Sequence, residues 1–358
     1  MRNVTVCTSR EQLAALAPYW DVLDTFMHAP FGEHRWVLSC ADTLTGDAQL
    51  FIPVVTEGRT PVAMAPLVLT RGCLCTMEQL GVELHGEPGD FNYRDEETLD
   101  GLVRELAEMR MPLVLVRTPA ESPLVAALQR AYRGRGVVLL RPRPDCPFID
   151  IEGTDDDVTE RLPASLRRDL RRGARKAGKF GAISVETHAP SSEHELLPIY
   201  EEALKVEAAG WKGRSRSALQ VNERVGRFYR AYASRACEQG ILRILFLRLG
   251  PDTAATMIAL ETQQRLWILK IGYDERFAAC SPGLLMMHEA LRYAARHELR
   301  SFEFLGSDAD WTRRWTSQGR QTCAVYVYPH SVHGGALLIR HTAGLLWRRA
   351  RHRLKSTP

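Results

Sequence analysis

The sequence of 358 residues has no apolar run long enough to span a membrane, and it does not start with the basic and then apolar segment of a secretion signal. Its eight cysteines are scattered and include no CxxC pair, which argues against a zinc site or a disulfide framework. We therefore expect no metal, and we expect the cytoplasm as the compartment.

The sequence as a whole also lacks a large excess of positive or negative charge, since its net charge at pH 7 is only +4. Residues 161–181 nevertheless carry eight basic residues and one acid, a charge of +7, and residues 340–355 carry +6. The remainder of the chain therefore carries −9. Two short basic segments on an acidic protein favour a localised anionic partner over general nucleic-acid binding.

The first basic segment has the pattern of a helix with Arg168, Arg172 and Arg175 at helical spacing, where like charges repel unless an anion compensates them. A phosphate of a cofactor, a nucleotide-linked sugar, an acidic polysaccharide or tRNA would serve, as would internal pairing with the acidic remainder. In the second segment, Leu345, Leu346 and Trp347 precede four arginines. This resembles a short interfacial helix, so peripheral membrane contact and a solvated terminal helix both stay open.

The composition, 45% hydrophobic and 25% charged, is that of a globular protein with room for two domains. Helical and strand patterns alternate along the chain, and a proline-rich break lies at residues 141–147. We predict an α/β domain over residues 1–147, a second one over residues 148–330 and a basic tail over residues 331–358.

Residues 266–306 read as strand, loop, helix and strand. Residues 266–273 are mostly apolar, and Ser281 and Pro282 are suited to the N-cap and first position of a helix. A strand that feeds a helix whose first amides point at an open loop is suited to bind an anion such as a cofactor phosphate. The same pattern also fits an ordinary crossover in an α/β protein.

Five further pieces follow one another along the second half of the chain. They are residues 207–219 (EAAGWKGRSRSAL), the hairpin 242–262, Lys270-x-Gly272-Tyr273-Asp274, Ser281-Pro282-Gly283, and residues 304–306 through Trp311-x-Arg313-Arg314-Trp315. In this order they resemble the CelD-like branch of the GNAT acyltransferase superfamily, which is similar to the FemABX peptidyltransferases. The resemblance covers residues 162–328 well and the first half more loosely. It implies two tandem GNAT-like α/β (α+β) units with mixed central sheets flanked by helices, and an acyl-donor cleft in the second.

The resemblance further implies acyl-CoA, in the first instance acetyl-CoA, as co-substrate. Its pyrophosphate would lie over residues 276–283, with the amides of Ser281, Gly283 and Leu284 as donors and Arg276 as the cation. Lys270 and Ile271 lie in the strand that would offer its backbone to pantetheine. Two departures from the family pattern are that Gly283 stands alone where a glycine-rich RxxGxG loop is usual, and that Thr312 replaces a lysine.

The residues also suggest catalytic roles. Transfer to an amine needs a base for the nitrogen proton and a donor for the departing thiolate. Glu261, at a strand end, is the expected base, and Tyr273 is the expected donor; a solvated strand-end carboxylate and an aromatic that caps the core are the simpler alternatives. Trp211 and Lys212 are expected to line the acceptor site, and Arg313 and Arg314 to bind acceptor phosphate.

We therefore predict an acyltransferase that moves an acyl group, in the first instance acetyl, from acyl-CoA to an amine by direct attack. The expected acceptor is a small molecule or glycan amine, such as an amino sugar or another cell-envelope or polysaccharide precursor. Two alternatives stay open: a FemABX-type peptidyltransferase that uses aminoacyl-tRNA, and a non-catalytic binding protein for anionic glycans.

Overall fold

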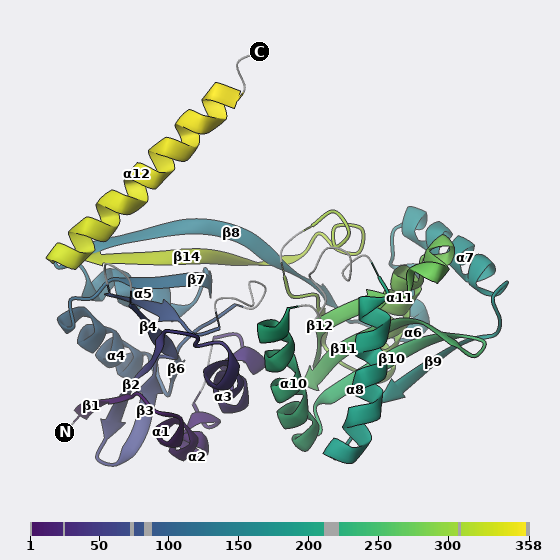
Figure 1. Ribbon diagram of the computed structural model, residues 1–358, viewed down its shortest axis with the longest axis horizontal. Coiled ribbons are helices and arrows are strands. Elements are labelled where there is room, and N and C mark those ends of the chain that lie inside the picture. The colour runs from purple at the N-terminus through teal and green to yellow at the C-terminus, as the bar shows by residue number, and fades with distance from the viewer. Residues whose placement is uncertain are drawn as a thin grey trace. The chain divides into compact units, whose positions relative to one another are not determined.

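The computed structural model describes residues 2–23, 26–71, 75–81, 88–210, 222–306 and 309–355 (Figure 1). The chain forms two compact units. Unit 1 consists of Met1–Arg143 with Gln321–Pro358, and unit 2 consists of Pro144–Arg320. Both combine a sheet with helices, so the predicted α/β class is confirmed. No helix within the described residues is both long and apolar enough to cross a membrane.

Unit 1 is built on a mixed sheet. Its strand order is β6 (Asn92–Tyr93), β3 (Thr60–Met64), β2 (Gln49–Glu57), β4 (Leu67–Arg71), β5 (Cys75–Gln79), β7 (Leu113–Pro119), β14 (Gly319–Pro329) and β8 (Gly136–Asp150), and β1 (Arg2–Cys7) pairs with β2. Only β5 and β7 are parallel among the pairs with a described register.

The helices of unit 1 are α1 (Arg10–Ala15), α2 (Ala17–Trp20), the 3-10 turn η1 (Pro30–Gly32), α3 (His34–Thr43), α4 (Glu96–Glu108), α5 (Pro123–Ala131) and α12 (Val332–Lys355). Helix α4 shows why they form. Asp95 caps it in a reciprocal capping box with Thr98. Leu99, Leu102 and Leu106 recur at helical spacing and are buried in the core against the sheet.

Two of the domain boundaries predicted from the sequence differ from those in the structure. Residues 321–358 belong to unit 1, because β14 pairs with β7 from Thr322 to Val327. The prediction had ended the second domain at residue 330 and had treated residues 331–358 as a separate tail. The proline-rich residues 141–147 are not a break but part of the single strand β8. Pro142 and Pro144 are two residues apart, so their missing N–H groups fall on the same edge of the strand.

Unit 2 contains a second mixed arrangement of strands. The order is β8, through its residues 148–150, then β13 (Ser301–Glu303), β12 (Arg265–Tyr273), β11 (Asp252–Thr262), β10 (Leu242–Leu249) and β9 (Ile183–His188). β12 and β13 are parallel and the other neighbours are antiparallel. The predicted hairpin over residues 242–262 is confirmed by the pairing of β10 with β11.

The helices of unit 2 are α6 (Asp155–Glu160), α7 (Ala164–Ala177), α8 (Glu193–Ala208), α10 (Glu223–Glu238), the 3-10 turn η3 (Glu275–Cys280) and α11 (Pro282–Arg296) (Figure 1). Leu245, Leu247 and Leu249 belong to the core shared with α7 and α11. Successive strand residues point to opposite faces, so α8 and α10, which pack on the same strands, cover the other face.

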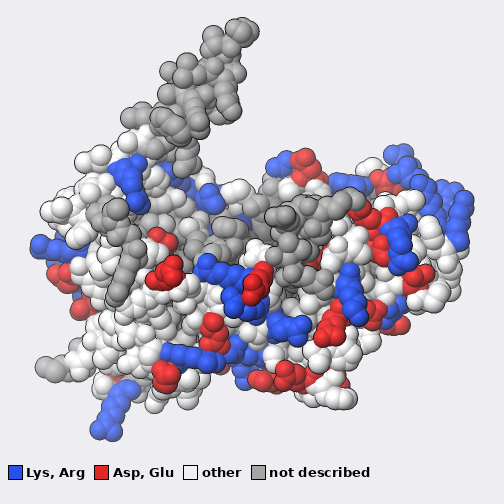
Figure 2. All heavy atoms as spheres, viewed as in Figure 1, with Lys and Arg blue, Asp and Glu red and all other residues white. Residues whose placement is uncertain are grey.

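Helix α7 contains most of the first basic segment and is one-sided. Leu166, Leu170, Gly173 and Ala177 form its buried stripe. A Cβ on Gly173 would lie 2.8 Å from the carbonyl oxygen of Cys280, so the helix approaches η3 closely. Its basic residues occupy the opposite, exposed side, where Figure 2 shows a group of blue side chains.

Asp90 in unit 1 gives a testable pH effect. It is buried, and it accepts hydrogen bonds from the Ser122 hydroxyl (2.9 Å) and the Phe91 amide (2.8 Å). Burial raises its pKa to about 6. The unfolded chain releases this proton at lower pH than the folded one, so the free energy of unfolding should fall as the pH rises from about 4 to about 6.

The expected loss is about 3 kcal/mol, from a shift of about two pKa units at about 1.4 kcal/mol each. Asp90→Asn should remove this part of the pH dependence, measured as the urea midpoint of unfolding between pH 4 and pH 7. The exposed Asp47→Asn is the control. An unchanged pH dependence in Asp90→Asn would contradict the assignment.

Candidate active site

Unit 2 contains a cavity of about 430 Å³ between α8, β12, α11 and the segment that follows β13. Its walls are mostly apolar, with one carboxylate and one phenol. The lining residues are Glu207, Gly210, Ile271, Gly272, Tyr273, Gly283, Leu284, Met287, Trp311 and Trp315.

The cavity lies where β12 extends beyond its pairing with the short strand β13, and this point is called the divergence of the two strands. β12 pairs with β11 along its length, but with β13 only from Arg265 to Trp267. The register with β11 shifts between Ile258 and Ala259, so Leu269 is an extra residue in β12. Beyond the divergence, Ile271 and Tyr273 line the cavity. This part of β12 is suited to pair with an extended ligand.

Two glycines let the end of α8 approach β12. A Cβ on Gly272 would lie 2.7 Å from the Cα of Glu207, and a Cβ on Gly210 would lie 2.7 Å from the carbonyl oxygen of Tyr273. No side chain fits at either position without a shift of backbone. The close approach brings Glu207, which is only 4% exposed, into the cavity wall.

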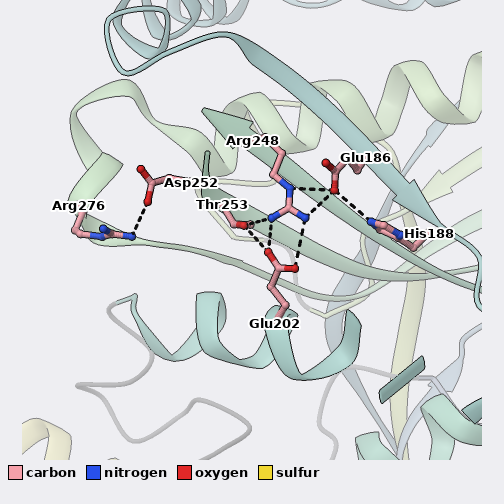
Figure 3. Close-up of polar contacts among 7 residues, drawn as sticks. All are labelled: Glu186, His188, Glu202, Arg248, Asp252, Thr253 and Arg276. Carbon is pink, nitrogen blue, oxygen red and sulfur yellow. Dashed lines mark hydrogen bonds and ion pairs between the residues drawn. The ribbon is translucent and has the colours of Figure 1, made fainter. Parts of the chain in front are cut away.

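Helix α8 is anchored on the sheet by Arg248 of β10, as Figure 3 shows. Arg248 donates to Glu186 of β9 at 2.7 and 3.0 Å and also to Glu202 of α8. The guanidinium lowers the pKa of Glu186. Thr253 of β11 donates to Glu202 as well. Glu202 lies five residues before Glu207, so this cluster fixes the part of α8 that leads to the cavity.

The start of α11 offers fewer amides than expected. Ser281 caps the helix in a left-handed conformation (φ 55°). Of the three predicted amide donors, Ser281 already donates to Ala278 and Leu284 donates to Ser281, each at 3.0 Å. Gly283 lines the cavity, close to the Tyr273 ring, and its amide has no such acceptor in the described part of the chain.

Arg276 and Lys270 do not line this cavity. Arg276 pairs with Asp274 (2.8 Å) and with Asp252 (3.5 Å), and its side chain is 67% exposed. Figure 3 shows it directed toward Asp252. The Lys270 ammonium lies 4.5 Å from the centre of the Tyr229 ring. Arg276 is therefore engaged by two carboxylates, and Lys270 adjoins the cavity only through its neighbour Ile271.

Glu261 requires a correction, because the structure does not bring it to the cavity. In the antiparallel register Glu261 lies opposite Leu266, while Tyr273 lies opposite Ala255, so the two predicted catalytic residues are at opposite ends of the strands. The Glu261 carboxylate accepts from Arg243 (3.0 Å) and from the Tyr293 hydroxyl (2.6 Å). Its contacts are those of a structural ion pair.

Of the four residues predicted to bind the acceptor, the structure describes two. Trp211 and Lys212 lie outside the described residues. Arg313 pairs with Asp310 (3.1 Å) and Arg314 pairs with Asp169 (2.7 Å), and neither lines the cavity. Their neighbours Trp311 and Trp315 do.

The sequence analysis did not select Glu207, Met287 or the two tryptophans as site residues. The i, i+4 spacing of the tryptophans was a signal for a shared helical face. Within the described residues, no group of three or more His, Cys, Asp and Glu side chains is arranged to hold a metal ion.

Comparison with known proteins agrees with this architecture. Residues 164–313 match the family model of the acetyltransferase (GNAT) domain. The fold is similar to the C-terminal domain of a putative lysylphosphatidylglycerol synthetase from Agrobacterium fabrum, with 13% identity, a TM-score of 0.55, and coverage of 92% of this chain and 96% of that one. No curated protein matches the sequence.

Two further solved structures share the fold. FemX is 11% identical with a TM-score of 0.52 over 91% of this chain and 97% of its own. A conserved protein of unknown function from Bacteroides thetaiotaomicron is 9% identical with a TM-score of 0.52, over 91% and 100%. Unit 2 therefore has the fold of an acetyltransferase (GNAT) domain. The match over residues 164–313 agrees with the resemblance to GNAT acyltransferases found in the sequence, and FemX shares the fold.

The contact of Gly272 with α8 can be tested by Gly272→Ala. The added methyl would meet the backbone of α8, so we expect a loss of about 1–3 kcal/mol in the free energy of unfolding. Urea unfolding of both variants measures it. The control is Gly178→Ala, whose Cβ would make only ordinary contacts at 3.6 Å or more. Equal midpoints for the two variants would show that α8 does not approach β12 this closely.

Proposed function

We propose that unit 2 transfers an acyl group from acyl-CoA to an amine by direct attack. The observation that carries this proposal is the cavity at the diverging end of β12, where a strand edge, the start of α11 and a buried carboxylate meet. The edge of β12 suits the amides of pantetheine, and the mostly apolar walls suit an acyl chain.

In this proposal, α7 supplies the positive charge that binds the phosphates of acyl-CoA. Helix α7 carries Lys176 in its last turn, and the helix packs on the loop that precedes α11. Gly173 packs directly on the Cys280 carbonyl. Lys176 lies three residues after Gly173 on α7, and in this proposal it takes the role that the sequence analysis gave to Arg276. Gly283 supplies an amide at the helix start.

Glu207 is the proposed base. The amine nitrogen attacks the thioester carbonyl carbon, Glu207 accepts the nitrogen proton directly or through water, and the carbon–sulfur bond breaks to release the thiolate. The Tyr273 side chain at the end of β12 lines the same cavity, and in this proposal its hydroxyl gives the thiolate a proton. The acceptor in this proposal is an amine of a small molecule or a glycan, such as an amino sugar of an envelope precursor.

An aminoacyl-tRNA donor is the second candidate. Arg168 and Arg175 of α7 and Lys179 just after it are exposed and form no ion pair within the described part of the chain, which would suit a longer anionic backbone. The affinities for the two acyl donors should depend differently on salt concentration. Several phosphate contacts make the affinity for tRNA fall steeply as the salt concentration rises.

The donor is tested by ligand binding. At a hundredfold excess over its Kd, CoA or acetyl-CoA should stabilise the protein by about 2.7 kcal/mol, which thermal unfolding measures. Lys176→Gln should weaken this binding, whereas Lys205→Gln, on another helix of unit 2, should not. No shift with CoA, acetyl-CoA or longer acyl-CoAs would overturn the proposal. Binding of tRNA in that case would favour the second candidate.

The base is tested by comparing Glu207→Gln with Glu261→Gln. Glu207→Gln should lower kcat by about 10²–10⁴-fold while acetyl-CoA still binds, measured as CoA thiol release with glucosamine as the amine. Glu261→Gln should keep kcat but lose about 1–2 kcal/mol of stability, because Arg243 and Tyr293 lose their charged acceptor. The reverse pattern would return the catalytic role to Glu261.

A further inference from the structure

Unit 1 has a cavity of its own, of about 510 Å³. It lies between β5, β7, β8, β14 and the first turns of α12, which Figure 1 shows beginning beside the ends of β8 and β14. It is lined by Thr76, Glu78, Val114, Arg141, Pro142, Arg143, Tyr326, Leu337, Arg340 and His341. None of these residues belongs to the acyl-donor cavity of unit 2.

The charge of this lining is strongly positive. Arg141 and Arg143 of β8 and Arg340 of α12 face one carboxylate, that of Glu78, which accepts a hydrogen bond from the Thr70 hydroxyl at 3.0 Å. None of the three arginines has a carboxylate within 4.0 Å among the described residues. Other arginines of unit 1 are paired: Arg94 with Glu57 and Arg130 with Asp100, each at 2.7 Å. The cavity therefore gathers cations that form no ion pair with the described residues.

One of these cations is held in a fixed position. The guanidinium carbon of Arg141 lies 5.2 Å from the centre of the Tyr326 ring, and its Nη1 donates to His341 Nε2 at 3.3 Å. Because an arginine only donates, Nε2 must accept, and the other ring nitrogen of His341 contacts the Tyr328 hydroxyl. β8, β14 and α12 thus orient one face of the guanidinium and leave its remaining donors for a ligand.

We propose that this cavity binds the phosphate or diphosphate group of a ligand. Planar guanidinium groups bind phosphate oxygens in pairs, and three of them around one cavity exceed what a single carboxylate ligand needs. Val114, Pro142 and Leu337 give the cavity an apolar side for the organic part of a phosphate ester. The group has two sources, a soluble phosphate ester or the headgroup of an anionic lipid, and both present the same chemistry.

The test uses the full chain with inorganic pyrophosphate as the probe in isothermal titration calorimetry. Arg143→Gln and Arg340→Gln remove exposed cations without touching the core, and each should weaken binding about tenfold or more, as expected for a charge-assisted contact. Arg59→Gln, at the exposed turn between β2 and β3, removes the same charge elsewhere in unit 1 and should leave binding unchanged.

A second arm measures flotation with vesicles of phosphatidylglycerol, with phosphatidylcholine vesicles as the neutral control. Binding of pyrophosphate that depends on Arg143 and Arg340 supports a soluble ligand. Vesicle binding that depends on the same two residues, without pyrophosphate binding, supports a lipid headgroup. Binding of neither probe, or binding that Arg143→Gln and Arg340→Gln leave intact, overturns the site. These results do not depend on CoA binding by unit 2, so the two proposals can fail separately.

Discussion

The cavity of unit 2 depends on the short pairing between β12 and β13. Parallel strands that stayed paired would close the sheet and bury the edge of β12 in backbone hydrogen bonds. Here the pairing ends at Trp267, while β12 continues to Tyr273. The backbone of the last part of β12 is therefore placed at a cavity, and the helix that follows begins beside it. Ligand groups can then take the place of a neighbouring strand.

The second constraint is the close packing of α8 on β12, which is possible only because two positions at the contact are glycines. Gly272 and Gly210 let a helix end lie against a strand at backbone contact distance. The Arg248 cluster holds the same helix on the sheet through Glu202, so Glu207 is positioned by contacts on both sides (Figure 3). Burial of a carboxylate is costly, and a rigid frame around it is consistent with a functional role.

Much of unit 2 could be predicted from local pattern. The strand ending at Tyr273, the helix after Ser281 and Pro282, and the hairpin before them all occur as predicted, because apolar periodicity and capping chemistry act over a few residues. The full length of β8 was not predicted, because prolines usually end strands and the sequence analysis placed a break at residues 141–147.

The sequence by itself determined the strands and helices around the cavity, the resemblance to GNAT acyltransferases and the existence of a basic helix, because these follow from spacing and from an ordered series of short motifs. That this helix, α7, is basic on one side only emerged from the structure. Only the tertiary structure decided which side chains meet. Glu261 looked suited to catalysis at a strand end, but antiparallel register carries it to the far end from Tyr273. Glu207, 54 residues earlier in the chain, reaches the cavity instead because two glycines remove the side chains that would keep α8 away.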